Sequence, residues 1–167
     1  MAKNILADKI LIIDFGSQYT QLIARRVREL GVYCEIYHHK SSLKSIKDFN
    51  PKGVILSGGP ETVKQKGSPK VPDQLFNLGI PILGICYGMQ SIAKQLGGRV
   101  ELADKREFGH ADLKIKNQAS GLFKKIKAKK INVWMSHGDH VSKLPKGFKA
   151  CGATLNSPIA ALYHPTK

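Results

Sequence analysis

The sequence has few cysteines and no long apolar run, and both shortages exclude classes of protein. Its 167 residues include three cysteines, Cys34, Cys86 and Cys151. An odd number at such wide spacing excludes a disulfide framework and a zinc site built from closely spaced pairs. No apolar run approaches the roughly 18 residues of a membrane span, and the N-terminus has no apolar signal core. We therefore expect a cytoplasmic protein that binds no membrane and holds no metal.

Acidic residues are also scarce, which leaves a strongly basic chain. Lysine and arginine number 27 against 12 acidic residues, a net charge of +15. From Leu113 onward there are eleven lysines and one acidic residue, Asp139, a balance of +10. Such a surface could bind nucleic acid, but lysine dominates over arginine and few aromatic residues are available to stack on bases. We therefore favour a solvated lysine-rich face, and keep docking of a partner as an alternative.

What is present is enough for a folded domain. Hydrophobic residues make up 42% and charged residues 23% of the chain, which excludes a disordered protein. A chain of this length corresponds to about one domain and can bury a core without disulfides. We expect a single domain over residues 1–167.

The first hundred residues alternate between apolar strand-like runs and amphipathic helix-like runs. This alternation indicates βαβ units, so we predict a doubly wound, flavodoxin-like α/β fold with a mostly parallel sheet and helices on both faces. The expected strands are Ile10–Ile13, Val32–Tyr37, Gly53–Ser57 and Ile80–Ile85, and the expected helices are Gln18–Leu30, Leu43–Phe49, Asp73–Leu78 and Met89–Leu96.

The remainder of the chain has a different pattern. Short strand-like runs joined by turns predict an antiparallel annex to the parallel sheet. These runs are Ala111–Lys116, Lys130–Met135, Phe148–Thr154 and Ile159–Tyr163.

One motif carries chemistry. Residues Gly84–Gly88 read Gly-Ile-Cys-Tyr-Gly between a buried strand and an amphipathic helix, which is the thiol counterpart of the Gly-x-Ser-x-Gly nucleophile elbow. The glycines permit the sharp turn that exposes the Cys86 sulfur, and the N-terminus of the following helix favours a thiolate. We therefore predict that Cys86 is a nucleophile, whereas Cys34 and Cys151 lie inside strand-like runs and are expected to be structural.

A thiolate that attacks an amide carbon creates an oxyanion, which needs hydrogen-bond donors. The N–H of Tyr87, directly after the nucleophile, is one candidate. The loop Gly58–Pro60 could supply a second N–H, because glycine lets the backbone approach closely. An ordinary turn at the end of a strand explains this loop equally well.

Five segments together form a recognisable pattern: Ile13–Gly31, Leu56–Glu61, Gly84–Gln90, Arg106–Gly109 and Val133–Asp139. The pattern resembles the class I, cysteine-dependent glutamine amidotransferase domain of glutamine-hydrolysing GMP synthases, from about Lys9 to the last residue. The resemblance implies the class I glutamine amidotransferase fold. It also implies hydrolysis of glutamine to glutamate and ammonia through a cysteine thioester.

The resemblance further implies roles for individual residues. Cys86 is the nucleophile, the N–H groups of Gly59 and Tyr87 form the oxyanion hole, and Gln90, His137 and Asp139 help to hold glutamine. No cofactor is implied for this domain. A separate synthetase domain, in the same longer chain or on a partner chain, would use ATP and Mg²⁺ to convert XMP to GMP, and the full protein would be a homodimer.

The sequence departs from the family pattern near its end. The catalytic base and its acid are expected in a His-Pro-Glu motif, but the one His-Pro pair, His164-Pro165, is followed by Thr166. We therefore reject His164 as the base. We expect that the domain is truncated before this motif, and that the chain alone is poorly active, because a thiolate mechanism needs a base.

Two other functions remain open. One is a different cysteine-dependent hydrolase of the same fold, with His137 or His140 as base, although Ser136–His140 is as readily interpreted as a turn between strands. The other is a non-catalytic, basic fragment that binds nucleic acid.

Overall fold

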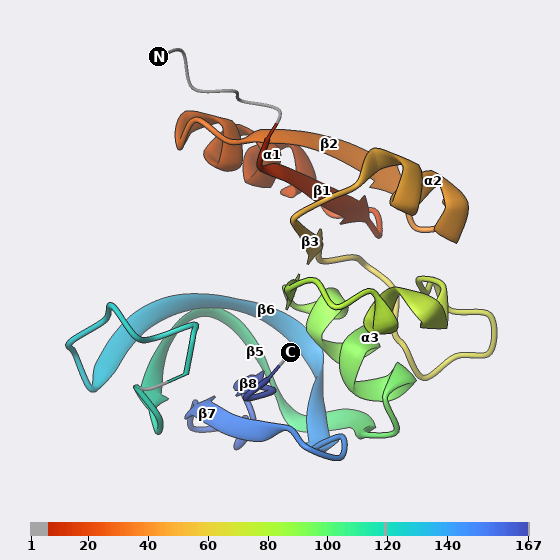
Figure 1. The fold of residues 1–167 in the computed structure, drawn as a ribbon. Coiled ribbons are helices and arrows are strands. Elements are labelled where there is room, and N and C mark those ends of the chain that lie inside the picture. The colour runs from red at the N-terminus through yellow and green to blue at the C-terminus, as the bar shows by residue number, and fades with distance from the viewer. Residues whose placement is uncertain (1–6, 119, 167) are drawn as a thin grey trace. The chain divides into compact units, whose positions relative to one another are not determined.

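The computed structural model describes residues 7–118 and 120–166, without the side chains of residues 104–106. These residues form two units, one that extends to Ser91 and a second that covers Ile92–Thr166. Each unit has its own sheet (Figure 1). The expected single domain over residues 1–167 stays a prediction.

The sheet of the first unit is parallel throughout. Its strands are β1 (Lys9–Asp14), β2 (Tyr33–His38), β3 (Gly53–Leu56) and β4 (Ile82–Gly84), in the order β2-β1-β3-β4. The chain moves from β1 to one side for β2 and then to the other side for β3. The carboxyl ends of β1 and β3 therefore form the switch point at which open parallel sheets bind ligands.

Helices cover both faces of this sheet, as predicted. In α1 (Thr20–Glu29), Ala24 packs with Ile12 and Cys34. In α2 (Leu43–Phe49), the Phe49 ring lies 6.4 Å from the ring of Tyr33. Cys34 and Tyr33 are successive residues of β2, and successive strand residues point to opposite faces. The two helices therefore lie on opposite faces of the sheet.

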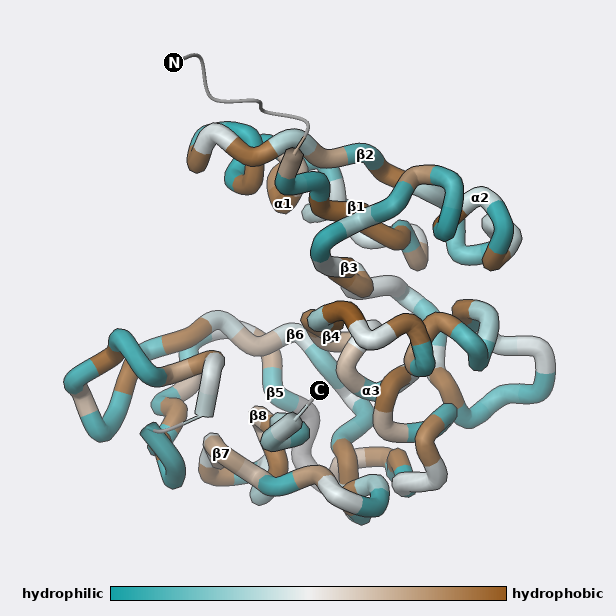
Figure 2. Tube along the Cα trace, viewed as in Figure 1, coloured by the Kyte–Doolittle hydropathy of each residue, from teal (hydrophilic) through white to brown (hydrophobic). Residues whose placement is uncertain are grey.

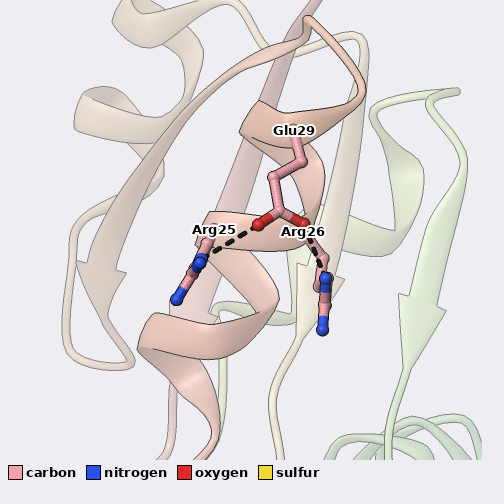
Figure 3. A network of polar contacts seen from close by, with 3 residues as sticks. All are labelled: Arg25, Arg26 and Glu29. Atoms are coloured by element: carbon pink, nitrogen blue, oxygen red, sulfur yellow. Dashed lines mark hydrogen bonds and ion pairs between the residues drawn. The ribbon is translucent and has the colours of Figure 1, made fainter.

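Apolar residues on one side of α1 and charged residues on the other explain how it packs. Ile23, Ala24 and Val27 contact the sheet, while the exposed side carries ion pairs from Arg25 and Arg26 to Glu29 at 2.9 and 2.7 Å (Figure 3). Such exposed pairs contribute little stability, so burial of the apolar face fixes this helix.

The remaining helical segments of the chain differ slightly from expectation. Residues Asp73–Asn77 form a 3₁₀ helix, η1, where an α-helix was expected over Asp73–Leu78. The helix after the cysteine motif, α3, covers Tyr87–Gln95.

The core of the first unit lies along its central strands. Figure 2 shows hydrophobic residues along β1 and β3, and the fully buried Leu11, Ile12 and Leu56 belong to these strands.

The second unit contains the predicted antiparallel sheet, whose first two strands are longer and whose last two strands are shorter than expected. Its strands are β5 (Arg99–Ile115), β6 (Lys130–Lys143), β7 (Lys149–Ala153) and β8 (Ala161–Tyr163), in the order β6-β5-β7-β8. Leu113, Phe123, Cys151 and Ala161 form its core cluster.

The interpretation of Ser136–His140 as a turn is wrong, because these residues lie inside β6. The polar side chain of Ser136 is compatible with a strand because alternate positions of β6 from Lys130 to Ser136 are exposed, whereas residues 137–140 are half-buried. β5 also begins earlier than predicted, and its pairing with β6 is irregular between Leu102 and Glu107.

Candidate active site

Cys86 lies in a sharp turn between β4 and α3. Its φ of 49° is one of two positive values at non-glycine residues described in the structure. A cysteine in this region of φ/ψ space is strained, and such strain is found at functional sites where the surrounding structure holds it. The side chain is exposed, whereas Cys34 and Cys151 are buried. The expected sharp turn at Cys86 between a strand and a helix is therefore formed, and the two other cysteines are buried.

The elbow requires glycine at position 88. A Cβ there would collide with the backbone carbonyl oxygen of Leu56, at the end of β3. The Gly88 N–H instead donates hydrogen bonds to the carbonyl oxygens of Ser57 and Ile85 at 3.0 and 2.9 Å. The start of α3 is thus held directly against the end of β3, which fixes the position of Cys86.

The Gly58–Gly59 loop lies beside the cysteine. A Cβ built on Gly58 would be 3.7 Å from the Cβ of Cys86, and a Cβ on Gly59 would be 2.6 Å from the carbonyl oxygen of Phe15. Only glycine at position 59 lets the loops after β1 and β3 approach so closely. The loop thus lies beside Cys86, and its interpretation as part of an oxyanion hole stays a prediction.

A polar network joins these two loops. Ser57 Oγ accepts a hydrogen bond from the Phe15 N–H at 3.0 Å and donates one to the Gly58 carbonyl oxygen at 2.8 Å. Asp14 Oδ1 accepts hydrogen bonds from the Gly16 N–H at 2.9 Å and the Thr20 hydroxyl at 2.6 Å. Burial raises the pKa of Asp14, but these hydrogen bonds outweigh it, so the pKa is lowered overall.

Tyr87 is held in place by contacts of its side chain. Its hydroxyl donates to the Pro69 carbonyl oxygen at 2.6 Å, and its ring lies 5.0 Å from that of Phe15. Burial raises the pKa of Tyr87 to about 12, so the phenol stays protonated. Tyr87 is the first residue of α3, and the first N–H groups of a helix have no intrahelical acceptor.

The pKa of the Cys86 thiol is raised, whereas the sequence led us to expect a lowered pKa. The N-terminus of α3 favours the thiolate, but partial desolvation of the sulfur, in a residue that is exposed as a whole, raises the pKa of the Cys86 thiol above its ordinary value. A raised pKa favours the protonated thiol over the thiolate. Activation of the thiol requires a base that removes its proton.

The predicted glutamine-binding residues lie in different units. Gln90 belongs to the first unit, is buried on α3, and its N–H donates to the Cys86 carbonyl oxygen at 3.1 Å. His137 and Asp139 lie on β6 in the second unit.

Sequence reasoning missed the residue that contacts His137. Glu107 Oε2 lies 3.4 Å from His137 Nε2, and the exposed fractions of the two side chains are 7% and 13%. Burial lowers the pKa of His137, while the nearby Glu107 carboxyl group and Asp139 raise it, and the result is a lowered pKa. Glu107 belonged to one of the recognised segments, but nothing in that segment indicated a pair with position 137.

The structure adds little for the other candidate groups. The His164 ring packs edge-on against Phe148, with the ring centroids 5.1 Å apart.

Among residues 7–118 and 120–166, no group of three or more His, Cys, Asp or Glu side chains is placed to hold a metal ion. None of the helices in that part of the chain is both long enough and apolar enough to cross a bilayer. The lysines between Gly121 and Lys130 are exposed, as expected of a solvated face.

Comparison with known proteins decides the family. The model of the class I glutamine amidotransferase family matches residues 11–167. The chain belongs to the class I glutamine amidotransferases. The resemblance inferred from the cysteine motif and the four other segments is thereby confirmed.

GMP synthases are among the similar proteins. The chain is 55% identical over its whole length to the glutamine-hydrolysing GMP synthase of Hahella chejuensis and 52% identical to that of Vibrio vulnificus. It spans 33% and 32% of these two proteins, about a third of each.

Solved structures confirm the fold. A protein of Thermoplasma acidophilum that is named as one subunit of a GMP synthase superposes with a TM-score of 0.83, at 30% identity over 96% of this chain and 79% of that one. A glutamine amidotransferase of Thermotoga maritima has a TM-score of 0.75 at 20% identity, covering 94% of this chain and 71% of that one. The predicted α/β fold with a parallel sheet and an additional antiparallel sheet is confirmed.

Proposed function

We propose that this chain is the glutaminase part of a GMP synthase, in which Cys86 hydrolyses glutamine to glutamate and ammonia. The observation that carries the proposal is the position of Cys86 in a strained, exposed elbow between β4 and α3, with the Gly58–Gly59 loop beside it. The family match and the similarity to GMP synthases support the choice of glutamine as substrate.

The first half of the reaction forms a thioester. After a base removes the thiol proton, the Cys86 sulfur attacks the amide carbon of glutamine, and the carbonyl oxygen becomes an oxyanion. The N–H groups of Gly59 and Tyr87 donate hydrogen bonds to this oxyanion. The tetrahedral intermediate then collapses, the amide nitrogen accepts a proton and leaves as ammonia, and a γ-glutamyl thioester remains on Cys86.

The second half hydrolyses the thioester. Water loses a proton to the base and attacks the same carbonyl carbon, and a second oxyanion forms at the same two N–H groups. Its collapse breaks the carbon–sulfur bond, releases glutamate and returns the thiol. Gln90, His137 and Asp139 hold the glutamine during both halves, a role that rests on the resemblance of their segments to the family.

The ammonia is consumed elsewhere in the enzyme. An ATP-dependent synthetase part, which requires Mg²⁺, activates XMP and transfers the nitrogen to form GMP, in a homodimeric protein of the cytoplasm. The similarity to GMP synthases, of which the chain spans about a third, supports the synthetase part; the Mg²⁺, the homodimer and the cytoplasmic location follow from the resemblance of the sequence segments to that family. No cofactor is assigned to the glutaminase part.

The base is expected in a His-Pro-Glu motif, which the 167 residues do not contain. Together with the raised pKa of the Cys86 thiol, this leads us to expect low glutaminase activity from the 167-residue chain alone. The rate of ammonia release from glutamine, measured for the 167-residue chain and for the full chain, tests that expectation. Equal rates would contradict it.

The central experiment replaces the nucleophile. In the full chain, Cys86→Ala is expected to abolish release of ammonia from glutamine while synthesis of GMP from XMP with added ammonia continues. Retained glutaminase activity in Cys86→Ala would overturn the proposal. Cys151→Ala, at a buried cysteine of the second unit, is the matched control and should keep glutaminase activity.

A further inference from the structure

Phe15 packs against both segments that carry the proposed oxyanion donors. It directly follows the last residue of β1, and its side chain is 3% exposed. Its ring lies 5.0 Å from the ring of Tyr87, the first residue of α3, and its backbone lies against Gly59. All three residues belong to the first unit, so the arrangement is complete within one unit.

The Phe15 ring packs against two other rings. It stacks on the ring of His39 with centroids 5.8 Å apart and planes 18° from parallel, and it meets the Tyr87 ring with planes 53° apart. His39 directly follows β2, and Tyr87 begins α3. Aromatic pairs at such separations attract one another beyond the effect of their buried area. The ring therefore holds the residue after β1 against the end of β2 and the start of α3.

The backbone of Phe15 contacts the loop after β3. Its N–H donates a hydrogen bond to Ser57 Oγ at 3.0 Å. A Cβ built on Gly59 would be 2.6 Å from the Phe15 carbonyl oxygen and 3.0 Å from the Phe15 Cβ. Because this glycine lies so close to residue 15, a shift of the Phe15 backbone would also shift the loop.

Phe49 shows what a phenylalanine that only fills the core would contact. It is also a buried residue of the first unit, with an exposed fraction of 8%. Its ring lies 6.4 Å from that of Tyr33 and 5.7 Å from that of Tyr37, both on β2. Phe15 differs because its ring and its backbone contact two separate segments of the proposed site.

We propose that Phe15 is a positioning residue, which sets the relative position of the Gly59 and Tyr87 N–H groups and so shapes the oxyanion hole. This role rests on the proposed function. Because the oxyanion forms only after the Cys86 sulfur attacks, its donors stabilise the transition state more than bound glutamine. Misplacement of groups in such a site by about 1 Å can lower a rate about 10²-fold. Loss of the ring therefore lowers kcat and leaves KM nearly unchanged.

The first arm of the test observes the two segments without using activity. In the full chain, Phe15→Leu keeps an apolar side chain but removes the ring. We expect backbone amides of residues 56–61 and 86–90 to exchange hydrogen about tenfold faster, because both segments open more often; mass spectrometry of peptides measures this. Phe49→Leu removes the same ring elsewhere in the unit and should leave both segments unchanged. Unchanged exchange in Phe15→Leu, or equal changes in the two variants, would overturn the proposal.

The second arm separates transition-state stabilisation from binding. Phe15→Leu is expected to lower kcat for ammonia release about tenfold and Phe15→Ala about 10²-fold, with the KM for glutamine within about twofold. Phe49→Leu should change neither constant. If Phe15→Ala fails to fold, Phe15→Leu still decides. A normal kcat in Phe15→Leu, an equal loss in Phe49→Leu, or an effect on KM alone contradicts the proposal.

The two proposals can fail separately. If Cys86→Ala keeps glutaminase activity, the proposed function fails and the role of Phe15 in hydrolysis fails with it, but hydrogen exchange still decides whether Phe15 holds both segments. If Cys86→Ala abolishes activity and Phe15→Leu has a normal kcat, only the role of Phe15 is overturned.

Discussion

Ser57 Oγ accepts a hydrogen bond from the Phe15 N–H at 3.0 Å, and this contact joins the loop after β1 to the loop after β3. The two loops flank the switch point of the parallel sheet, and the second contains Gly59. This hydrogen bond therefore contributes both to the stability of the first unit and to the position of the loop that would form the oxyanion hole. A single side chain can therefore be used to test both.

Ser57→Ala leaves the buried Phe15 N–H without its acceptor. We expect the free energy of unfolding to fall by about 1–3 kcal/mol, and kcat for glutamine hydrolysis to fall with it because the Gly58–Gly59 loop loses its anchor. Urea unfolding and steady-state kinetics measure the two effects. Ser42→Ala removes the hydroxyl that accepts from the Ser45 N–H at the start of α2 and should cost about 1 kcal/mol without a change in kcat. Equal effects of both variants on kcat would contradict the prediction.

Gly88→Ala is expected to destabilise the first unit severely. Its Cβ would collide with backbone of β3, which cannot move aside as a flexible side chain can. A loss of about 3 kcal/mol or more, or failure to fold, follows from such overpacking, and thermal unfolding measures it. Gly121→Ala adds the same methyl group where no atom lies within 4 Å. If the two variants unfold at the same temperature, the elbow is not packed as described.

Gly59→Ala tests the loop rather than the fold. A Cβ at position 59 would be 2.6 Å from the Phe15 carbonyl oxygen, so the loop must shift and carry its N–H away from the proposed oxyanion position. Loss of one such donor lowers kcat about 10²- to 10³-fold in other enzymes. We expect a decrease of this size with a nearly unchanged KM and a smaller loss of stability than in Gly88→Ala. A normal kcat would remove Gly59 from the oxyanion hole.

Alkylation should report the environment of Cys86 directly. Because Cys86 is exposed and the two other cysteines are buried, iodoacetamide is expected to modify one residue of the native chain, which peptide mass spectrometry identifies. The pKa of the thiol is raised by burial, and only the thiolate reacts. The rate should therefore keep rising with pH beyond the ordinary thiol value of about 8.5. A plateau near neutral pH would show instead that the thiolate is stabilised at rest.

The first unit was largely predictable because its signals are local. Buried parallel strands read as short β-branched runs, and Gly84–Gly88 combines a strand end, two glycines and a helix start within a few residues. The nucleophile elbow follows from this combination. The contact between Gly59 and Phe15 was not predictable, because it joins segments more than forty residues apart.

The second unit was predicted less well because its structure depends on contacts between segments that are distant in the sequence. β5 and β6 expose many of their side chains, so their polar residues resembled turn residues. The pair of Glu107 and His137 depends on the register of two strands after an irregularity. A slip of one residue would turn one of these side chains to the other face, and no local pattern in either strand determines that register.

The position of β6 at the edge of its sheet has a consequence for how copies of this chain behave in a crowded solution. Fourteen residues of strand offer backbone donors and acceptors on one side, and such an edge is a template on which another chain can add. Lys130 and Lys143 are exposed at its two ends, and the surrounding excess of lysine makes approaching copies repel one another. Among the described residues no strand pairs with the outer side of β6, and the excess of lysine disfavours the addition of a second copy there, an effect that weakens as salt screens the charges.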